Sequence, residues 1–198
     1  AAYGTYMLAA SNPAFAQLIY ASPLRWVIML APLALVFFLS FKIHSMSVSS
    51  AQTTFWAYAA LLGVSLSSIF LVYTGASITQ TFFITATTFG AMSLYGYTTK
   101  KDISSWGSFL FMGLIGLIIA SIVNIFMQSG ALSFAISAIG VLVFTGLTAY
   151  DTQTIKEAYY EGDDTDTAGR KAIIGALQLY LDFINLFIML LRLLGNRE

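Results

Sequence analysis

Cysteine is absent from the 198 residues, and histidine occurs only once, at His44. A chain without cysteine has no disulfide framework, no thiolate nucleophile and no thiolate metal site. A single histidine also excludes a multi-histidine metal cluster within one chain. We therefore expect no resident metal or other cofactor.

Charge is equally scarce. Lys, Arg, Asp and Glu make up 9% of the residues, compared with about 25% in a typical soluble domain. Nine basic and nine acidic side chains balance to a formal net charge of +0, while 58% of the residues are hydrophobic. So few charges cannot cover a soluble core, and they argue against a disordered chain, a soluble enzyme and a nucleic-acid-binding protein. The composition indicates an integral membrane protein.

Long apolar runs divide the chain into candidate helices. A spanning helix needs about 20 mostly apolar residues, and a partial run at Ala1–Ala10 reads as the end of a span whose first part is missing. Together with six longer runs, it predicts an all-α bundle of seven transmembrane helices, with a truncated first helix and a single domain over residues 1–198. The six longer runs are Leu24–Phe41, Thr54–Tyr73, Ile78–Tyr97, Ser105–Met127, Ser133–Ile155 and Ala172–Leu194.

The distribution of Lys and Arg predicts the orientation. With seven spans, three basic residues, Arg25, Arg192 and Arg197, fall on one side of the membrane. Cytoplasmic loops carry an excess of Lys and Arg. We therefore place the N-terminus and the Glu161–Lys171 loop in the cytoplasm, on the side that holds the other six: Lys42, Lys100, Lys101, Lys156, Arg170 and Lys171.

Two aspartates lie in otherwise apolar sequence, Asp151 in VLVFTGLTAYDTQT and Asp182 in ALQLYLDFINLFIM. An ionisable side chain at membrane depth costs at least about 2.5–3.5 kcal/mol and is a functional-site hypothesis by default. Measured from a predicted turn between Gly162 and Lys171, each lies about 16 Å along its helix at 1.5 Å per residue. We therefore expect the two carboxylates to lie at similar depth on antiparallel helices and to contact each other.

Two carboxylates in a low dielectric cannot both ionise cheaply, so such a pair tends to share a proton and to titrate as one unit. The protonated pair is a hydrogen-bonded latch, and the doubly ionised pair repels itself. Its oxygens are also hard ligands that would hold Ca²⁺ transiently. The alternative is that each aspartate pairs with a base such as Lys156, Arg25 or Arg192.

The last span carries a polar stripe on one face, with spacings of four and three residues. Such a stripe is buried against protein or a wet cavity, and we favour a helix that lines a route over simple interhelical hydrogen bonding. Outside the stripe, a packing role is favoured for Asn124, and His44 reads as a solvated loop residue. The acidic segment EGDDTDT lacks the ligand order of an EF-hand and reads as a solvated turn. The stripe consists of Gln178, Asp182, Asn185, Met189 and Arg192.

The segments around the two aspartates resemble a known family. TAYDTQTIK and LQLYLDFINLFIMLLRLLG are similar to motifs of the Bax inhibitor-1/YccA family, the transmembrane Bax-inhibitor-motif proteins, and the similarity continues through Tyr95–Phe126. The resemblance covers nearly the whole chain from about residue 50 onward.

The resemblance implies a seven-helix fold with the last helix central, and a pH-sensitive calcium leak gated by an aspartate pair. Matched motif to motif, that pair falls on Asp151 and Asp182. Beside the pair, Gln178, Asn185 and Arg192 of the polar stripe and Lys42 are candidate lining or supporting residues. Some members carry an arginine near the end of the second span that pairs with the aspartates. This sequence has Lys42 and His44 there instead.

Four functions remain open from the sequence, and one of them, a proton-coupled solute transporter, is disfavoured because the expected broken helices and internal repeat are not evident. The other three are as follows. The first is the calcium leak, with Ca²⁺ and H⁺ as ligands and no enzymatic activity. The second is a membrane interaction protein without transport of its own. It would modulate a membrane-anchored ATP-dependent protease, to which the resemblance links bacterial relatives, or a cell-death or stress pathway. The third, an intramembrane aspartyl protease, is disfavoured because Leu179, Tyr180 and Leu181 stand where the Gly-x-Gly-Asp motif requires small residues. The short loops favour location in a bacterial inner membrane. We expect the lipid bilayer to be a partner of the protein, and we expect no binding to nucleic acid.

Overall fold

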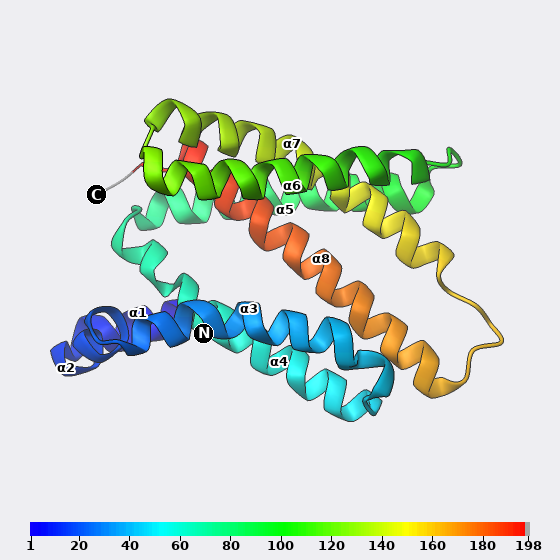
Figure 1. The fold of residues 1–198 in the computed structure, drawn as a ribbon, viewed down its shortest axis with the longest axis horizontal. Coiled ribbons are helices and arrows are strands. Elements are labelled where there is room, and N and C mark those ends of the chain that lie inside the picture. Colours follow the sequence, from blue (N-terminus) through cyan, green and yellow to red (C-terminus); the bar gives the residue numbers. More distant parts are fainter. Residues whose placement is uncertain (197–198) are drawn as a thin grey trace. The chain divides into compact units, whose positions relative to one another are not determined.

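A computed structural model describes residues 1–196 of the chain (Figure 1), and no β-strand occurs within that range. The N-terminal segment forms three short helices, α1, α2 and the π-helix η1. Two 3-10 helices, η2 and η3, extend α3 and α4. The elements are α1 Ala2–Ser11, α2 Pro13–Ala16, η1 Gln17–Ala21, α3 Leu24–Lys42, η2 Ile43–Ser45, α4 Val48–Ser65, η3 Leu66–Leu71, α5 Gly75–Thr98, α6 Ser104–Met127, α7 Gly130–Glu157 and α8 Thr165–Leu194.

Five helices in the described range are long and apolar enough to cross a membrane, which agrees with the predicted all-α membrane protein. All six long predicted spans fall on helices, but the Thr-rich α5 is not among these five, and α1 has only 10 residues. The total of seven spans therefore stays a prediction. The five are Leu24–Ser45, Val48–Leu71, Ser104–Met127, Gly130–Glu157 and Thr165–Leu194.

The chain forms two compact units. The first contains Ala1–Gly75 and Asp163–Ile174, and the second contains Ala76–Gly162 and Gly175–Asn196. Within the first unit α3 packs along α4, and within the second α6 packs along α7 (Figure 1). Helix α8 contributes its first ten residues to the first unit and the remainder to the second.

The core of the second unit lies where α6, α7 and α8 meet. Val143 and Phe144 on α7 pack there with Leu186 on α8, which is fully buried. Phe183, also on α8, makes edge contacts with Phe82 and Phe89 of α5. Close van der Waals packing of this kind holds helices together in a lipid environment, where burial from water contributes little.

The α6–α7 turn assigns Asn124 a structural role. Asn124 Nδ2 donates to Ser133 Oγ (2.7 Å), and its Oδ1 accepts from the backbone N–H of Ser129 (3.0 Å). Between the two helices Gln128 adopts a left-handed conformation with φ of 50°, which ends α6. The sequence-based preference for packing over function at Asn124 therefore agrees with the structure.

The predicted turn between Gly162 and Lys171 was wrong in its extent, because α8 begins at Thr165. Asp164 precedes that first residue and accepts hydrogen bonds from the backbone N–H (2.7 Å) and the hydroxyl (3.1 Å) of Thr167. Such a cap satisfies donors that the first helical turn leaves unpaired. It lets α8 start seven residues before the apolar run that marked it in the sequence.

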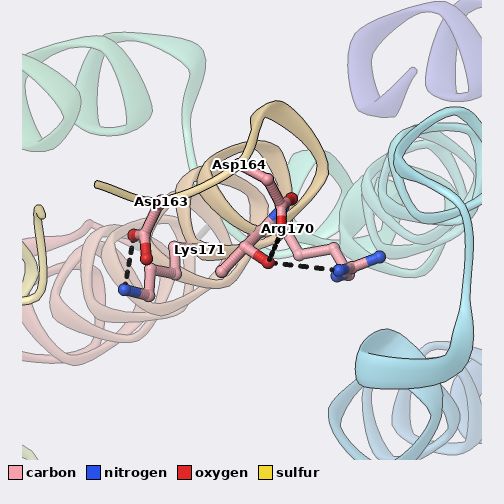
Figure 2. Close-up of polar contacts among 5 residues, drawn as sticks. Asp163, Asp164, Arg170 and Lys171 are labelled. Atoms are coloured by element: carbon pink, nitrogen blue, oxygen red, sulfur yellow. Dashed lines mark hydrogen bonds and ion pairs between the residues drawn. The ribbon is translucent and has the colours of Figure 1, made fainter. Parts of the chain in front are cut away.

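Figure 2 shows the polar contacts at this helix start, all of them within the first unit. Lys171 donates to Asp163 at 2.6 Å. Arg170 donates to Thr167 Oγ1 (3.4 Å) and to the carbonyl oxygen of Met46 (3.3 Å). Two of the four acidic residues in EGDDTDT thus have structural partners, in line with a turn rather than a calcium-binding loop.

Replacing Asp164 with alanine is expected to lower the melting temperature and to loosen the first turn of α8. The bonds from Thr167 and the nearby Arg170 favour the ionised carboxylate and lower the pKa of Asp164. A depressed folded-state pKa gives stabilisation that is present above the unfolded value and is lost as pH falls through the folded value. Hydrogen exchange at residues 165–168 should therefore quicken in the variant at pH 7, and the difference from the unaltered chain should shrink as the pH falls through the lowered pKa of Asp164. The variant Asp164→Asn keeps a capping oxygen and should retain most of the protection.

Candidate functional site

A cavity of about 560 Å³ opens in the second unit between α6, α7 and α8. We call it the acidic cavity because Asp151 of α7 and Asp182 of α8 both line it. Its other polar groups come from Ser108, Tyr150, Gln178 and Asn185. The remaining lining residues are Gly107, Phe111, Leu114, Phe144, Leu147 and Leu181.

Asp182 is the most deeply buried charged residue of the described chain, with 4% of its surface exposed. Its carboxyl group lies within hydrogen-bonding range of the carboxyl group of half-buried Asp151. A hydrogen bond between two carboxyl groups requires a proton on one of them, because an ionised carboxylate only accepts. The Oδ2 atom of Asp182 has no hydrogen-bond partner among residues 1–196. A buried acceptor without a donor costs about 1–3 kcal/mol or more, so this oxygen is a natural place for a proton or a cation.

The structure brings the two aspartates together, although they do not lie at equal distances from the α7–α8 connection as the sequence spacing predicted. Asp151 lies close to the end of α7, whereas Asp182 lies far from the start of α8. The first ten residues of α8 belong to the other unit. Helix α8 meets α7 from Gly175, where an added Cβ would lie 3.1 Å from Ile155. From this contact Asp151 lies four residues back along α7 and Asp182 seven residues forward along α8, and their carboxyl groups come within hydrogen-bonding range.

The predicted polar stripe on α8 is only partly in the cavity. Gln178 and Asn185 line it together with Asp182. Asn185 Nδ2 donates to the carbonyl of Leu181 at 2.8 Å, which leaves its amide oxygen as the remaining acceptor. Met189 instead packs against Gly140 of α7, and Arg192 is exposed outside the cavity.

The alternative in which each aspartate pairs with a base does not hold within residues 1–196, where Lys171–Asp163 is the only ion pair. Lys156 donates to the carbonyl of Tyr97 (2.7 Å) and lies over its ring, and Arg25 lies over Trp26. Lys42 is exposed at the end of α3 in the first unit and does not line the cavity.

Two residues beside Asp151 were missed by the sequence argument. Tyr150 borders the cavity, and its ring lies over Gly107 of α6, where an added Cβ would come within 2.6 Å of Cζ. Buried Gln153 accepts from the backbone N–H of Ile103 (3.0 Å) and donates to the carbonyl of Lys101 (2.9 Å). Gln153 thus ties the end of α7 to the α5–α6 connection and holds the segment that carries Asp151.

The donor set suits a proton or a hard cation. Two carboxyl groups and the amide oxygens of Gln178 and Asn185 are the kind of oxygen ligand that Ca²⁺ takes, usually six to eight at a time. No group of three or more His, Asp or Glu side chains with metal-site geometry occurs in the described chain.

The sequence matches one family model and several bacterial proteins. A family model described as "Inhibitor of apoptosis-promoting Bax1" matches residues 1–198. "Uncharacterized protein RP147" of Rickettsia prowazekii (strain Madrid E) is 56% identical over 87% of this chain and 73% of its own length. "Inner membrane protein YbhL" of Escherichia coli (strain K12) is 52% identical over 96% of this chain and 82% of its own. An uncharacterized protein of Caulobacter vibrioides is 51% identical over 89% of this chain and 72% of its own length.

Proposed function

The chain belongs to the family described as inhibitor of apoptosis-promoting Bax1, and from that premise we propose that it is a pH-sensitive calcium leak. In this proposal the proton shared by Asp151 and Asp182 controls the path. No chemical step on a ligand is involved, so the protein is not an enzyme. We also place this chain in a bacterial inner membrane, because its relative YbhL of Escherichia coli is named an inner membrane protein.

The observation that carries the proposal is the buried Oδ2 of Asp182, which has no donor although its carboxyl faces that of Asp151. A stable structural pair would be expected to satisfy such an oxygen. A site that exchanges protons and passes cations needs an acceptor that is free between events. The acidic cavity around it supplies room for such exchange.

The gate follows from the charge on the pair. With one shared proton, a hydrogen bond joins α7 to α8. Without it, the two carboxylates repel, and for a generic pair of unit charges at about 4 Å and an effective dielectric constant of 20 this repulsion is about 4 kcal/mol. Because 1.4 kcal/mol changes a population tenfold, this repulsion is large enough to move an equilibrium between closed and open arrangements. Gln153 fixes the end of α7, so α8 is the element proposed to move.

The full arrangement proposed has seven spans with α8 at the centre. The N-terminus and the α7–α8 connection, here Ala158–Asp164, lie in the cytoplasm, as the excess of Lys and Arg on that side favours. The oxygens of Gln178 and Asn185 would replace part of the hydration shell of a passing Ca²⁺, and Arg192 would lie toward the far side.

Calcium entry into liposomes tests the proposal. We expect the reconstituted protein to admit Ca²⁺ down a gradient, read by a trapped calcium dye, with flux at pH 8 at least tenfold above flux at pH 5. The variant Asp164→Asn alters an exposed carboxylate outside the cavity and serves as the matched control with unchanged flux. Equal fluxes from protein-containing and empty liposomes at every pH would refute the leak and leave the interaction protein as the remaining candidate.

A further inference from the structure

The acidic cavity is much larger than a metal ion requires. Its volume of about 560 Å³ lies within the range of about 300–1,000 Å³ typical of sites for small organic ligands. A water molecule, by comparison, has a share of liquid volume of about 30 Å³. The cavity is therefore large enough for an organic ligand that carries an apolar group as well as a charged one.

The part of the lining that α6 and α7 contribute changes from polar to apolar along these two helices. On α7, Asp151 and Tyr150 border the cavity near the helix end, and Leu147 and Phe144 follow about one and two turns deeper. On α6, Phe111 and Leu114 follow Ser108 in the same way. Six residues of helix span about 9 Å. An elongated amphiphile with one polar end fits this gradient.

The charge of the lining selects the polar end. Two carboxyl groups border the cavity, and no Lys, Arg or His is among the lining residues in the described chain. An anionic or phosphate-bearing ligand would find no counter-charge there. The buried Asp182 carboxyl, 4% exposed with an unpartnered Oδ2, calls for a donor, and burying a charge is tolerated when it is paired.

We propose that the acidic cavity binds a free amphipathic primary amine, with its ammonium on the Asp151–Asp182 pair and its apolar body between α6 and α7. An ammonium has three N–H donors, which match Asp182 Oδ2, the Asp151 carboxyl and the amide oxygen of Asn185. Phe111, Leu114, Phe144 and Leu147 line the apolar part. An ethanolamine lipid is a poorer fit, because its phosphate would follow the ammonium into a site without a basic residue.

Equilibrium binding tests this proposal independently of ion flux. Titration calorimetry on the protein in phosphatidylcholine nanodiscs at pH 7.5 would compare 4-phenylbutylammonium with the uncharged 4-phenylbutanol and with 4-phenylbutyrate. We expect the amine to bind one site per chain at least tenfold more tightly than either analogue. Because no ion gradient is used, calcium flux can be absent while amine binding stands, and the reverse.

Two variants separate the polar from the apolar part of the site. A hydrogen bond to a charged group accounts for about a tenfold change or more, so Asp182→Asn should weaken the amine at least tenfold and leave the alcohol unchanged. Leu147→Trp fills the apolar part and should weaken 4-phenylbutylammonium tenfold, while ethylammonium, which has no such body, changes less than twofold. The control Asp164→Asn should bind like the unaltered chain.

Several results would overturn the assignment. Equal affinities for the amine and the alcohol would remove the role of the carboxyl pair, as would full amine affinity in both cavity variants. If Asp182→Asn does not elute as a folded protein, the amine-to-alcohol ratio and Leu147→Trp decide. Adding phosphatidylethanolamine to the nanodiscs should leave the amine affinity unchanged, and a tenfold loss would show that lipid fills the cavity instead.

Discussion

Replacing Gly96 with alanine is expected to destabilise the second unit by about 1–3 kcal/mol or more, the cost of overpacking a well-filled contact. Gly96 lies on α5 against Ala149 of α7, and an added Cβ would collide with the Ala149 carbonyl oxygen and lie 3.0 Å from its Cα. Both partners are backbone atoms, and Ala149 is fully buried. Relief therefore requires the two helices to separate, since no side chain can rotate away.

Gly90 is the matched control on the same helix. A Cβ added there meets no atom within 4 Å, so Gly90→Ala should stabilise by about 0.5–1 kcal/mol, because alanine favours a helix over glycine. Reversible unfolding in mixed micelles would measure both variants against the unaltered chain. Opposite signs at the two positions are the expected result. A stabilising Gly96→Ala would mean that α5 and α7 are not in this close contact.

The helices were predictable from sequence because each long apolar run must become a helix in lipid, where backbone groups have no other partners. Their starts were less predictable. Asp164 begins α8 well before its apolar run, and Ser47 and Ser129 likewise accept from N–H groups at the starts of α4 and α7. Polar caps of this kind lie outside the hydrophobic signal, so a hydropathy reading places helix starts too late.

The aspartate pair was the most predictable part of the site, because a charge in apolar sequence stands out whatever the fold. Tyr150 and Gln153 were not found, since their roles depend on Gly107 and on the Lys101 carbonyl, which are distant in sequence. For a similar reason, the stripe of α8 residues predicted to line a route does not reach the cavity at Met189. Periodicity shows which residues share a helix face, but only the neighbouring helix decides whether that face meets a cavity or, as at Gly140, close packing.

The largest functional effect is expected from paired substitutions at Asp182. An asparagine there can still donate to Asp151, so Asp182→Asn should imitate the protonated pair and hold calcium flux at its low acid-side level from pH 5 to pH 8. Alanine can neither donate nor accept, so Asp182→Ala should remove the link between α7 and α8 and give high flux over the same range. A hydrogen bond to a charged group contributes about 1.5–3 kcal/mol, which corresponds to about a 10- to 100-fold difference in flux between the two variants.

The contrast between asparagine and alanine is what distinguishes a proton latch from a simple cation-binding carboxylate. If Asp182 only attracted Ca²⁺, both substitutions would remove the same charge and lower the flux equally at every pH. If the shared proton holds α7 to α8, they must act in opposite directions, and Asp151→Asn should behave like Asp182→Asn because the latch is reciprocal. Flux measured by the trapped dye at four pH values, with size-exclusion profiles to confirm folding, separates the two. Equal low flux from both Asp182 variants would contradict the latch while leaving a carboxylate-lined path intact.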